Sequence, residues 1–528
     1  MDRTQGIEAI KARTQPWDFI IIGGGATGLG CAVEAAARGY DPLLIEMHDF
    51  AKATSSRSTK LVHGGVRYLQ QGNISLVLEA LDERGTLQRN APHLVHPLSF
   101  VIPNYKWWEG PYYGLGMKVY DLLAGRQNFE RSQHLNRQET LNHLPTVQPD
   151  GLRGGVEYFD GQFDDARLAI NMAQTAVEQG GVAINYMKAT DLTKTNGEVD
   201  GVVAECQETG TKFNLPARSV INATGIFTDT IRQMDDPRAP RTLRPSRGTH
   251  IVLDRSFLPG DSALMVPKTD DGRVLFAIPW NERVVIGTTE AEVEDVSLEP
   301  CPNHEELQFL IEHAQRYLVG NPGPDDVLSI FAGIRPLVAP ADQADSDTAE
   351  ISRDHQLYTS ESGLVTISGG KWTTYRKMAE DTIDEALVEA ELDHRTSTTR
   401  DLHLHGWHQD ADQFGDLAAY GADAPALKEL MEEHPELSEP FDDRLPIRGA
   451  QVVWAARHEM ARTVEDVLSR RTRCLLLDAE ASIDIAPRVA QLLAEERDLP
   501  PSWAEEQVEA FTDVASNYLM PSTVSAVR

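Results

Sequence analysis

The chain has 528 residues, of which 41% are apolar and 25% charged, as is usual for a folded soluble protein. At roughly 150 residues per domain, this length predicts two to four domains. The net charge of −32 repels nucleic acid phosphates, so we expect no DNA or RNA partner. Two explanations of the acidity stay open, namely adaptation to high salt and an ordinary acidic cytosolic protein.

The cysteines and the N-terminus indicate a cytoplasmic setting. Four cysteines lie far apart without a CxxC pair, which is typical of a reducing compartment and gives no metal-binding set. The first 18 residues lack the apolar core of a signal peptide. No stretch approaches the roughly 18 apolar residues of a membrane-spanning helix. We therefore expect a cytoplasmic protein without a metal site or a transmembrane helix.

The N-terminal part predicts a short polar helix followed by a βαβ unit. Residues 1–16 suit the helix, and residues 18–22, Asp-Phe-Ile-Ile-Ile, are a largely apolar and β-branched run typical of a strand buried on both faces. Small residues from 26 to 38 predict a second helix, and residues 42–46 predict a second strand.

Later segments predict returns to the same sheet, an inserted sheet and a helical end. Residues 219–225 and 364–370 are short apolar runs that end in glycine. Between them we expect antiparallel strands at 249–253, 273–279 and 283–288. Beyond about residue 400 the pattern is helical, at 424–434, 451–469 and 485–497.

Residues 23–28 form a Gly-x-Gly-x-x-Gly motif between the first strand and its helix. Gly23 permits a tight turn, Gly25 lets the backbone approach a pyrophosphate, and Gly28 lets helix and strand pack closely. The helix N-terminus offers free N–H groups to phosphates. Glu46, 18 residues after Gly28, can accept hydrogen bonds from ribose hydroxyls. This context predicts a bound dinucleotide; the alternative is a glycine-rich turn without a ligand.

The motif alone does not choose between NAD and FAD, but two other segments favour FAD. The hydroxyl side chains of Thr54, Ser55 and Ser56 follow the Glu46 strand, where they could meet a phosphate or the ribitol. Residues 222–225 close another strand with small side chains. FAD is long and is held by segments distant in the sequence. The alternative for either segment is a local hydroxyl turn or a helix cap.

Residues 53–69 have the sequence Ala-Thr-Ser-Ser-Arg-Ser-Thr-Lys-Leu-Val-His-Gly-Gly-Val-Arg-Tyr-Leu. This segment resembles the signature of the quinone-linked, aerobic-type, FAD-dependent glycerol-3-phosphate dehydrogenases. The resemblance covers about residues 17–390 well and the C-terminal part more loosely. One departure is Glu290, where the family usually has aspartate. Further matching segments, in the same order, are 163–167, 222–225, 248–251, 286–289, 333–337 and 369–376.

The resemblance implies an α/β fold of the D-amino-acid-oxidase-like flavoproteins. It has an FAD-binding Rossmann-like domain, an inserted antiparallel-sheet substrate domain and a helical C-terminal domain. The expected limits are 17–85, 160–245 and 330–390 for the FAD-binding domain, 86–159 and 246–329 for the substrate domain, and 400–528 for the helical domain.

The resemblance also implies a reaction. Sn-glycerol 3-phosphate is oxidised to dihydroxyacetone phosphate by hydride transfer from C2 to FAD N5, and the electrons pass to a membrane quinone. Two alternatives stay open: a glycerol-3-phosphate oxidase that uses oxygen, and a catalytically idle FAD-binding partner subunit. We expect a homodimer, peripheral on the inner face of the cell membrane.

Positions matched to the family give candidate site residues. His250 is the preferred base for the C2 hydroxyl and His63 the alternative, while Arg335 could stabilise a forming alkoxide. The expected substrate-binding residues are Arg67, Tyr68, Arg353 and Lys371, unless these cations form structural ion pairs instead. The expected FAD-binding residues are Gly23, Gly25, Gly28, Glu46, Thr54, Ser55, Ser56, Lys60, Gly64, Gly65, Ala223, Gly225, Gly370, Thr373 and Thr374.

Residues 105–123 are the candidate membrane contact. The segment is rich in Trp and Tyr, which favour the membrane interface, and Lys106 and Lys118 flank apolar positions. The alternative is an ordinary packed helix of the substrate domain. Because two lysines add little attraction against a charge of −32, binding would depend on salt or on apolar burial.

Overall fold

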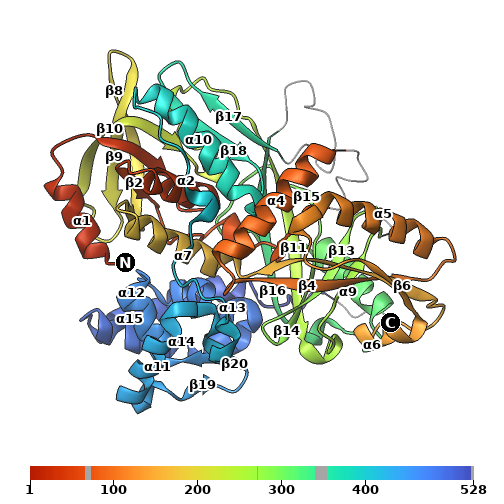
Figure 1. Ribbon diagram of the computed structural model, residues 1–528. Coiled ribbons are helices and arrows are strands. Elements are labelled where there is room, and N and C mark those ends of the chain that lie inside the picture. Colours follow the sequence, from red (N-terminus) through yellow and green to blue (C-terminus); the bar gives the residue numbers. More distant parts are fainter. Residues whose placement is uncertain (66–72, 270–271, 339–353, 525–528) are drawn as a thin grey trace.

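The computed structural model describes residues 1–65, 73–269, 272–338 and 354–524, which form two large sheets and a helical C-terminal region (Figure 1). The first sheet has the order β17-β18-β10-β1-β2-β7, and the hairpin β8–β9 extends from β10. Its strands are β1 Trp17–Ile22, β2 Pro42–Ile45, β7 Val182–Ile184, β8 Met187–Thr195, β9 Glu198–Cys206, β10 Lys212–Asn222, β17 His355–Thr359 and β18 Leu364–Gly369.

Strand β1 shows why a central strand of this sheet has an almost entirely apolar sequence. Phe19 and Ile21 pack into a core with the helices on one face, and Ile20 and Ile22 pack into a second core on the other face. Alternate side chains of a strand point to opposite faces, so a strand covered on both sides needs no polar positions. The covering helices are α2 Ala26–Ala37, α7 Asp165–Glu178 and α10 Tyr375–Glu389 on the first face, and α1 Arg3–Ala12 and α8 Thr228–Asp235 on the second.

The second sheet has the order β15-β11-β14-β13-β12-β4-β6-β3, with β16 on β11 and β5 on β6. Its pairs are antiparallel as expected, except for β12 with β4. The strands are β3 Leu61–Val62, β4 Val95–Asn104, β5 Gln133–Asn136, β6 Gly154–Phe163, β11 Leu243–Asp254, β12 Ala263–Val266, β13 Leu275–Trp280, β14 Arg283–Gly287, β15 Ala291–Glu292 and β16 Val327–Val338. The helices beside it are α4 Ile74–Asn90, α5 Glu109–Ala124, α6 Arg137–His143 and α9 His304–Tyr317.

Strands β16 and β3 extend this sheet beyond the limits predicted for the substrate domain. β16 pairs with β11 from Val327 to Val338, although the prediction ended that domain at residue 329. The FAD-binding segments therefore run directly into strands of the second sheet. This places the nucleotide motif and the candidate catalytic residues at one junction.

The C-terminal region is mainly helical and packs against the second sheet (Figure 1). Its core includes Val252 and Phe331 from β11 and β16. The helix predicted over 451–469 is interrupted, because the backbone turns at Met460 (φ 54°). The elements are α11 Ala424–Glu433, β19 Pro440–Asp442, β20 Leu445–Arg448, α12 Gly449–His458, a π-helical turn Asp466–Arg471, α13 Cys474–Leu477, α14 Ala479–Glu496 and α15 Pro501–Ser516.

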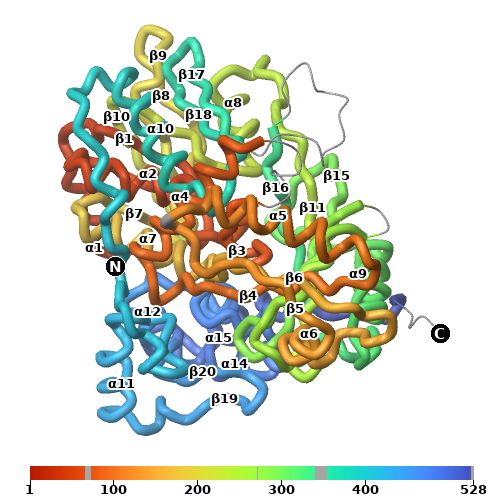
Figure 2. The backbone as a smooth tube through the Cα atoms, turned by 45° about the vertical axis from the view of Figure 1, so that its right-hand side comes forward, coloured from red at the N-terminus to blue at the C-terminus, as the bar shows by residue number. Residues whose placement is uncertain are grey.

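The end of the chain returns to the second sheet. After α15 the backbone carbonyl of Tyr518 accepts a hydrogen bond from the N–H of Ile330 at 2.8 Å. Val524, the last described residue, then packs into the core beside α9, and Figure 2 shows the end of the described chain on that side. The C-terminal region is thus attached to the sheet through its helices and through this final segment.

His405 joins the C-terminal region to α7. Its Nδ1 lies 2.5 Å from Glu178 Oε1 and its Nε2 lies 2.8 Å from Asp423 Oδ2. Burial disfavours the imidazolium, but the hydrogen bonds with Asp423 and Glu178 outweigh it and raise the pKa of His405 to about 9. The folded protein therefore holds a proton that the unfolded chain releases near pH 6.5.

We expect His405→Asn to destabilise the protein by on the order of 2 kcal/mol at pH 6, after allowance for partial exposure. Because the folded pKa is raised, the stability difference is complete below about pH 6.5 and disappears as the pH rises through about 9. Unfolding midpoints of wild type and variant at pH 6, 7.5 and 9.5 measure it. The exposed His394→Asn is the control, and a gap that does not change with pH would contradict the assignment.

Candidate active site

The turn between β1 and α2 shows why the motif needs its glycines. The N–H of Gly23, at φ 112°, donates to the carbonyl of Ile45 at 2.9 Å. A Cβ on Gly28 would lie 1.9 Å from the carbonyl oxygen of Gly23. Only glycine lets the helix approach the strand this closely. The N–H of Ala26, in the first turn of α2, donates to Ser55 Oγ at 2.9 Å.

Glu46 is held by the same turn. Its Oε2 accepts from the N–H of Gly24 at 2.6 Å, and its Oε1 accepts from the N–H of His48 at 2.8 Å. Burial raises the pKa of Glu46, and the two N–H donors oppose this effect. The residue also lines the adjoining cavity.

A cavity of about 520 Å³ adjoins this turn, and most of its lining comes from the first sheet and from the segments that follow its strands. Its volume lies within the roughly 300–1,000 Å³ typical of cofactor sites. The predicted residues that line it are Gly23, Gly25, Glu46, Thr54, Ser55, Ala223, Gly225, Gly370 and Lys371. These come from β1, β2, β10 and β18 or from the turns after them, so the segments assigned to one long ligand do converge. The glycine turn, the helix N-terminus, the acid and a cavity of this volume together fit FAD.

Several predicted FAD residues lie beside the cavity rather than along it. Gly28 acts through packing, as described above. The N–H of Gly64 donates to the Tyr120 hydroxyl at 2.9 Å, and Thr373 Oγ1 accepts from the N–H of His63 at 3.2 Å. The remaining ones outside the cavity lining are Ser56, Lys60, Gly65 and Thr374. Arg67, Tyr68 and Arg353 lie outside the described residues.

Part of the cavity wall is formed by residues that belong to none of the sequence motifs. Lys188 and Thr190 contribute from β8, and Thr230 and Met234 contribute from α8. No motif marks these positions, because they meet the cavity only through the folding of the hairpin and helix. Trp372 also lines the cavity, and its Nε1–H donates to the carbonyl of Ser55 at 3.0 Å.

His250 lies on β11 directly opposite Phe331 on β16. The two rings stack, with centroids 4.6 Å apart and planes 11° from parallel. His250 Nε2 lies 3.0 Å from Thr59 Oγ1, and Nδ1 has no hydrogen-bond partner within the described part of the chain. The side chain is only 2% exposed, so the fold fixes the ring position.

Arg335 shares this face of the β11–β16 pair. Gly248, two residues before His250, lies opposite Gly333, two residues after Phe331. Neither glycine has a side chain to fill the space above this face of the sheet. The guanidinium of Arg335 lies over Gly248. A Cβ on Gly248 would come within 2.4 Å of Arg335 Nη2, so a larger residue would displace the arginine. Nη2 also donates to Thr288 Oγ1 at 3.1 Å. Strand β16 also borders the cofactor space, because Pro336 lines the cavity and the lining residue Thr54 donates to the carbonyl of Ile334 at 2.6 Å, whereas His250 and Arg335 are not part of the lining.

The environment keeps His250 neutral. Burial, followed by the positive charges of Lys60 and Arg335, holds the pKa of His250 well below its usual range, while Asp165 opposes them. A neutral imidazole can accept a proton at physiological pH.

The loop that follows β14 is held by a buried side-chain hydrogen bond, in which Thr289 Oγ1 donates to Glu306 Oε1 at 2.7 Å.

Comparisons with known proteins agree with this geometry. The family described as FAD dependent oxidoreductase matches residues 18–376, and the C-terminal domain of alpha-glycerophosphate oxidase matches residues 363–507. The mitochondrial glycerol-3-phosphate dehydrogenase of Macaca fascicularis is 40% identical, over 94% of this chain and 72% of the relative. The Schizosaccharomyces pombe protein of the same name is 35% identical, over 97% and 88%.

Solved structures give the same result. A glycerol-3-phosphate dehydrogenase from Bacillus halodurans complexed with FAD has a TM-score of 0.78 and 30% identity, and 98% of each chain is covered. An L-alpha-glycerophosphate oxidase from Mycoplasma pneumoniae shares the fold, with a TM-score of 0.55, 18% identity and coverage of 74% of this chain and 98% of that one.

The fold and the site define an FAD-dependent oxidoreductase of the D-amino-acid-oxidase-like type. The chain belongs to the FAD-dependent glycerol-3-phosphate dehydrogenase family. The predicted resemblance, the α/β flavoprotein fold with a helical C-terminal domain, and FAD as cofactor are thereby confirmed.

Proposed function

We propose that this protein oxidises sn-glycerol 3-phosphate to dihydroxyacetone phosphate and delivers the electrons to a membrane quinone. The observation that carries the proposal is the buried, neutral His250 with the charge of Arg335 near it, on the strand pair β11–β16 whose residue Pro336 borders the cavity that fits FAD. A base and a fixed cation are what removal of a hydroxyl proton beside an anionic substrate requires. Membership of the family supplies the substrate.

FAD, which the turn 23–28, Glu46 and the wall 53–55 would hold, would supply the acceptor for the hydride that leaves C2 of the substrate. His250 receives the C2 hydroxyl proton at Nδ1 while its Nε2–H donates to Thr59 Oγ1. Arg335 stabilises the negative charge that forms on the substrate oxygen. Lys371, at the cavity wall, adds positive charge for the phosphate-bearing substrate. Arg67, Tyr68 and Arg353 are proposed to bind the phosphate.

Anaerobic addition of glycerol 3-phosphate to the FAD-loaded protein tests the reaction. We expect the yellow flavin absorbance to bleach and then to return on addition of a quinone. Absence of bleaching with fully loaded FAD would favour the idle partner subunit. Rapid oxygen consumption with peroxide formation in air would favour the oxidase.

A quinone acceptor requires contact with the bilayer, and we propose that α5 and its N-terminal approach provide it. No described helix is long and apolar enough to cross a membrane. Large exposed apolar side chains nevertheless gather here: Trp107 is 78% exposed, Leu115 68% and Leu122 79%. α4 packs beside α5 and adds the exposed Ile74 and Leu78. Such a patch on a water-soluble surface usually marks an interaction site.

We expect the double substitution Leu115→Glu and Leu122→Glu to reduce binding to phosphatidylcholine vesicles at least tenfold. Each leucine buried in the interface contributes about 1.5–3 kcal/mol, and a charged side chain removes that gain. Co-sedimentation measures the bound fraction. The control is Val388→Glu, at an apolar position that is 72% exposed on α10. Equal loss in both proteins, or none in the double variant, would contradict the assignment.

The same proposal places the protein in the cytoplasm, peripheral on the inner face of the cell membrane, as a homodimer. Fractionation of cells before and after a high-salt wash tests the location. Light scattering of the purified protein tests the oligomeric state.

A further inference from the structure

The segment from Asp49 to Lys60 connects β2 of the first sheet to β3 of the second sheet. Lys52, Ala53, Thr54 and Ser55 form one wall of the FAD cavity. Two charged side chains of this segment, Asp49 and Lys52, form ion pairs with residues 465–473 of the C-terminal region. None of the cavity-lining residues in the described part of the chain belongs to 465–473.

The first contact is an ion cluster around Asp49. Its carboxylate accepts from Arg470 Nε at 2.6 Å and from Arg471 at 2.7 and 2.9 Å, the latter through both terminal nitrogens. Asn185 Nδ2 also donates to Asp49, at 3.2 Å. Burial works to raise the pKa of Asp49, but the two guanidinium groups hold it below its usual value. Asp49 and both arginines are at most 2% exposed.

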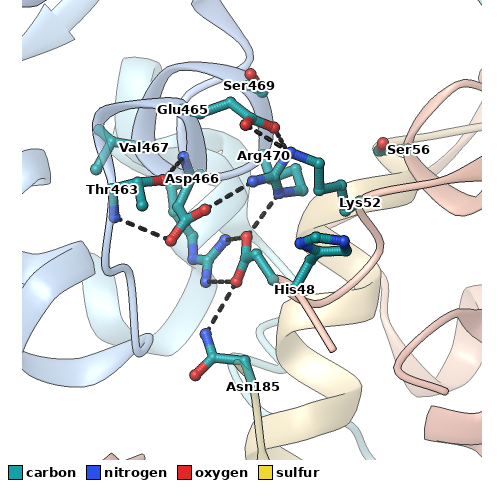
Figure 3. Close-up of polar contacts among 12 residues, drawn as sticks. His48, Lys52, Ser56, Asn185, Thr463, Glu465, Asp466, Val467, Ser469 and Arg470 are labelled. Atoms are coloured by element: carbon teal, nitrogen blue, oxygen red, sulfur yellow. Dashed lines mark hydrogen bonds and ion pairs between the residues drawn. The ribbon is translucent and has the colours of Figure 1, made fainter. Parts of the chain in front are cut away.

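The second contact joins the cavity wall to the same cluster (Figure 3). Lys52 Nζ lies 2.6 Å from Glu465 Oε2, and Glu465 Oε1 lies 2.8 Å from Arg470 Nη1. Arg470 Nη2 lies 2.7 Å from Asp466 Oδ1. Arg470 therefore binds both Glu465, which pairs with Lys52, and Asp49. Lys52 and Asp49 lie three residues apart in the same loop, so one arginine is linked to this loop at two positions. Burial and Lys52 lower the pKa of the adjacent His48 to about 4, so this histidine adds no charge at neutral pH.

The third contact lies at the end of the wall. The carbonyl oxygen of Ser56 accepts from Arg473 Nη2 and from Lys60 Nζ, each at 2.9 Å. Both cations also bind Asp165, at 2.7 Å in each case. Ser56 follows the cavity-lining Ser55 directly. Lys60, expected as an FAD ligand, thus shares its anion with an arginine of the C-terminal region.

We propose that residues 465–473 are a positioning element for FAD. They hold the loop 49–56 in the conformation that forms the cavity wall. Removal of one member of a buried ion pair leaves its partner uncompensated, so the loop cannot leave these contacts without a large cost. Docking of 465–473 and binding of FAD therefore favour each other, and such coupling is reciprocal. The inference requires FAD alone, so it stands or falls separately from the proposed substrate and acceptor.

Reciprocity gives a test on the unmodified chain. Hydrogen exchange is measured by mass spectrometry on the full-length protein with FAD bound and after its removal. We expect amides of 465–473 to exchange at least fivefold more slowly with FAD, although they do not line the cavity. The α15 segment 501–516 is the internal control and should not change. Protection of 23–28 and 53–55 without any change at 465–473 would overturn the proposal.

A matched pair of substitutions tests it from the other direction. Arg471→Lys keeps the charge but loses the two-pronged contact with Asp49, and Arg457→Lys makes the same change at an exposed pair with Glu496 on α14. We expect the FAD dissociation constant to rise at least tenfold in the first variant and to stay within twofold in the second. The KM for glycerol 3-phosphate at saturating FAD should not change.

Folding of the variants is checked by circular dichroism and gel filtration. If Arg471→Lys does not fold, Glu465→Gln replaces it, because this side chain is 14% exposed and its amide still accepts from Lys52. A several-fold weaker FAD affinity is expected for that variant. A folded variant that binds FAD as tightly as wild type would overturn the proposal.

Discussion

Replacement of His250 by asparagine should slow flavin reduction by glycerol 3-phosphate at least 100-fold while FAD remains bound. A positioned general base contributes about 10²–10⁴-fold, and asparagine cannot accept the proton. Asparagine can still donate to Thr59 and occupies less volume beside Phe331, so the stacked pocket should persist. Anaerobic stopped-flow absorbance measures the rate, and the absorbance ratio of flavin to protein measures FAD content.

His63→Asn is the matched control, because His63 is the alternative base. We expect a change of less than tenfold there. Since the pKa of His250 lies well below its usual range, the wild-type rate should stay constant between about pH 6.5 and 8. A large loss in His63→Asn with little change in His250→Asn would exchange the two roles.

Substitution of Gly28 by alanine should raise the FAD dissociation constant at least 100-fold. The new methyl group would lie 1.9 Å from the carbonyl oxygen of Gly23, where ordinary contact begins at 3.4 Å. The neighbour is backbone, so α2 must move away from β1 by roughly 1.5 Å, the difference of these two distances. That shift takes the helix N-terminus away from the pyrophosphate.

Titration of the FAD-free protein with FAD, followed by flavin fluorescence, measures the effect. Gly116→Ala is the control, since a Cβ at this position on α5 meets no atom within 4 Å. FAD affinity in Gly28→Ala within threefold of wild type would show that the turn tolerates the displacement.

The sequence by itself determined the elements whose side-chain pattern depends only on local geometry. The run Asp18–Ile22 is apolar at every buried position, because β1 is covered on both faces. The glycines at 23, 25 and 28 follow from the approach of backbone to backbone and to phosphate. The helix expected over 451–469 differs from the structure, because the turn at Met460 depends on contacts that periodicity does not record.

For the site, the motifs identified nine of the residues that line the FAD cavity, and most of these follow the end of a strand of the first sheet. They did not identify Lys188 or Met234, which reach the cavity from the β8 hairpin and α8 without a sequence signal. Lys60 shows the converse case. Its position within the motif suggested an FAD ligand, whereas its buried ammonium binds Asp165.

Only the tertiary structure decided which distant residues act together. The register between β11 and β16 brings His250 against Phe331 and places Arg335 over Gly248, although some 80 residues separate the strands in sequence. Folding also attaches Arg470, Arg471 and Arg473 to the loop that forms the cofactor wall. The sequence specifies local conformation through short-range sterics, whereas electrostatic and packing partners depend on how the whole chain is arranged in space.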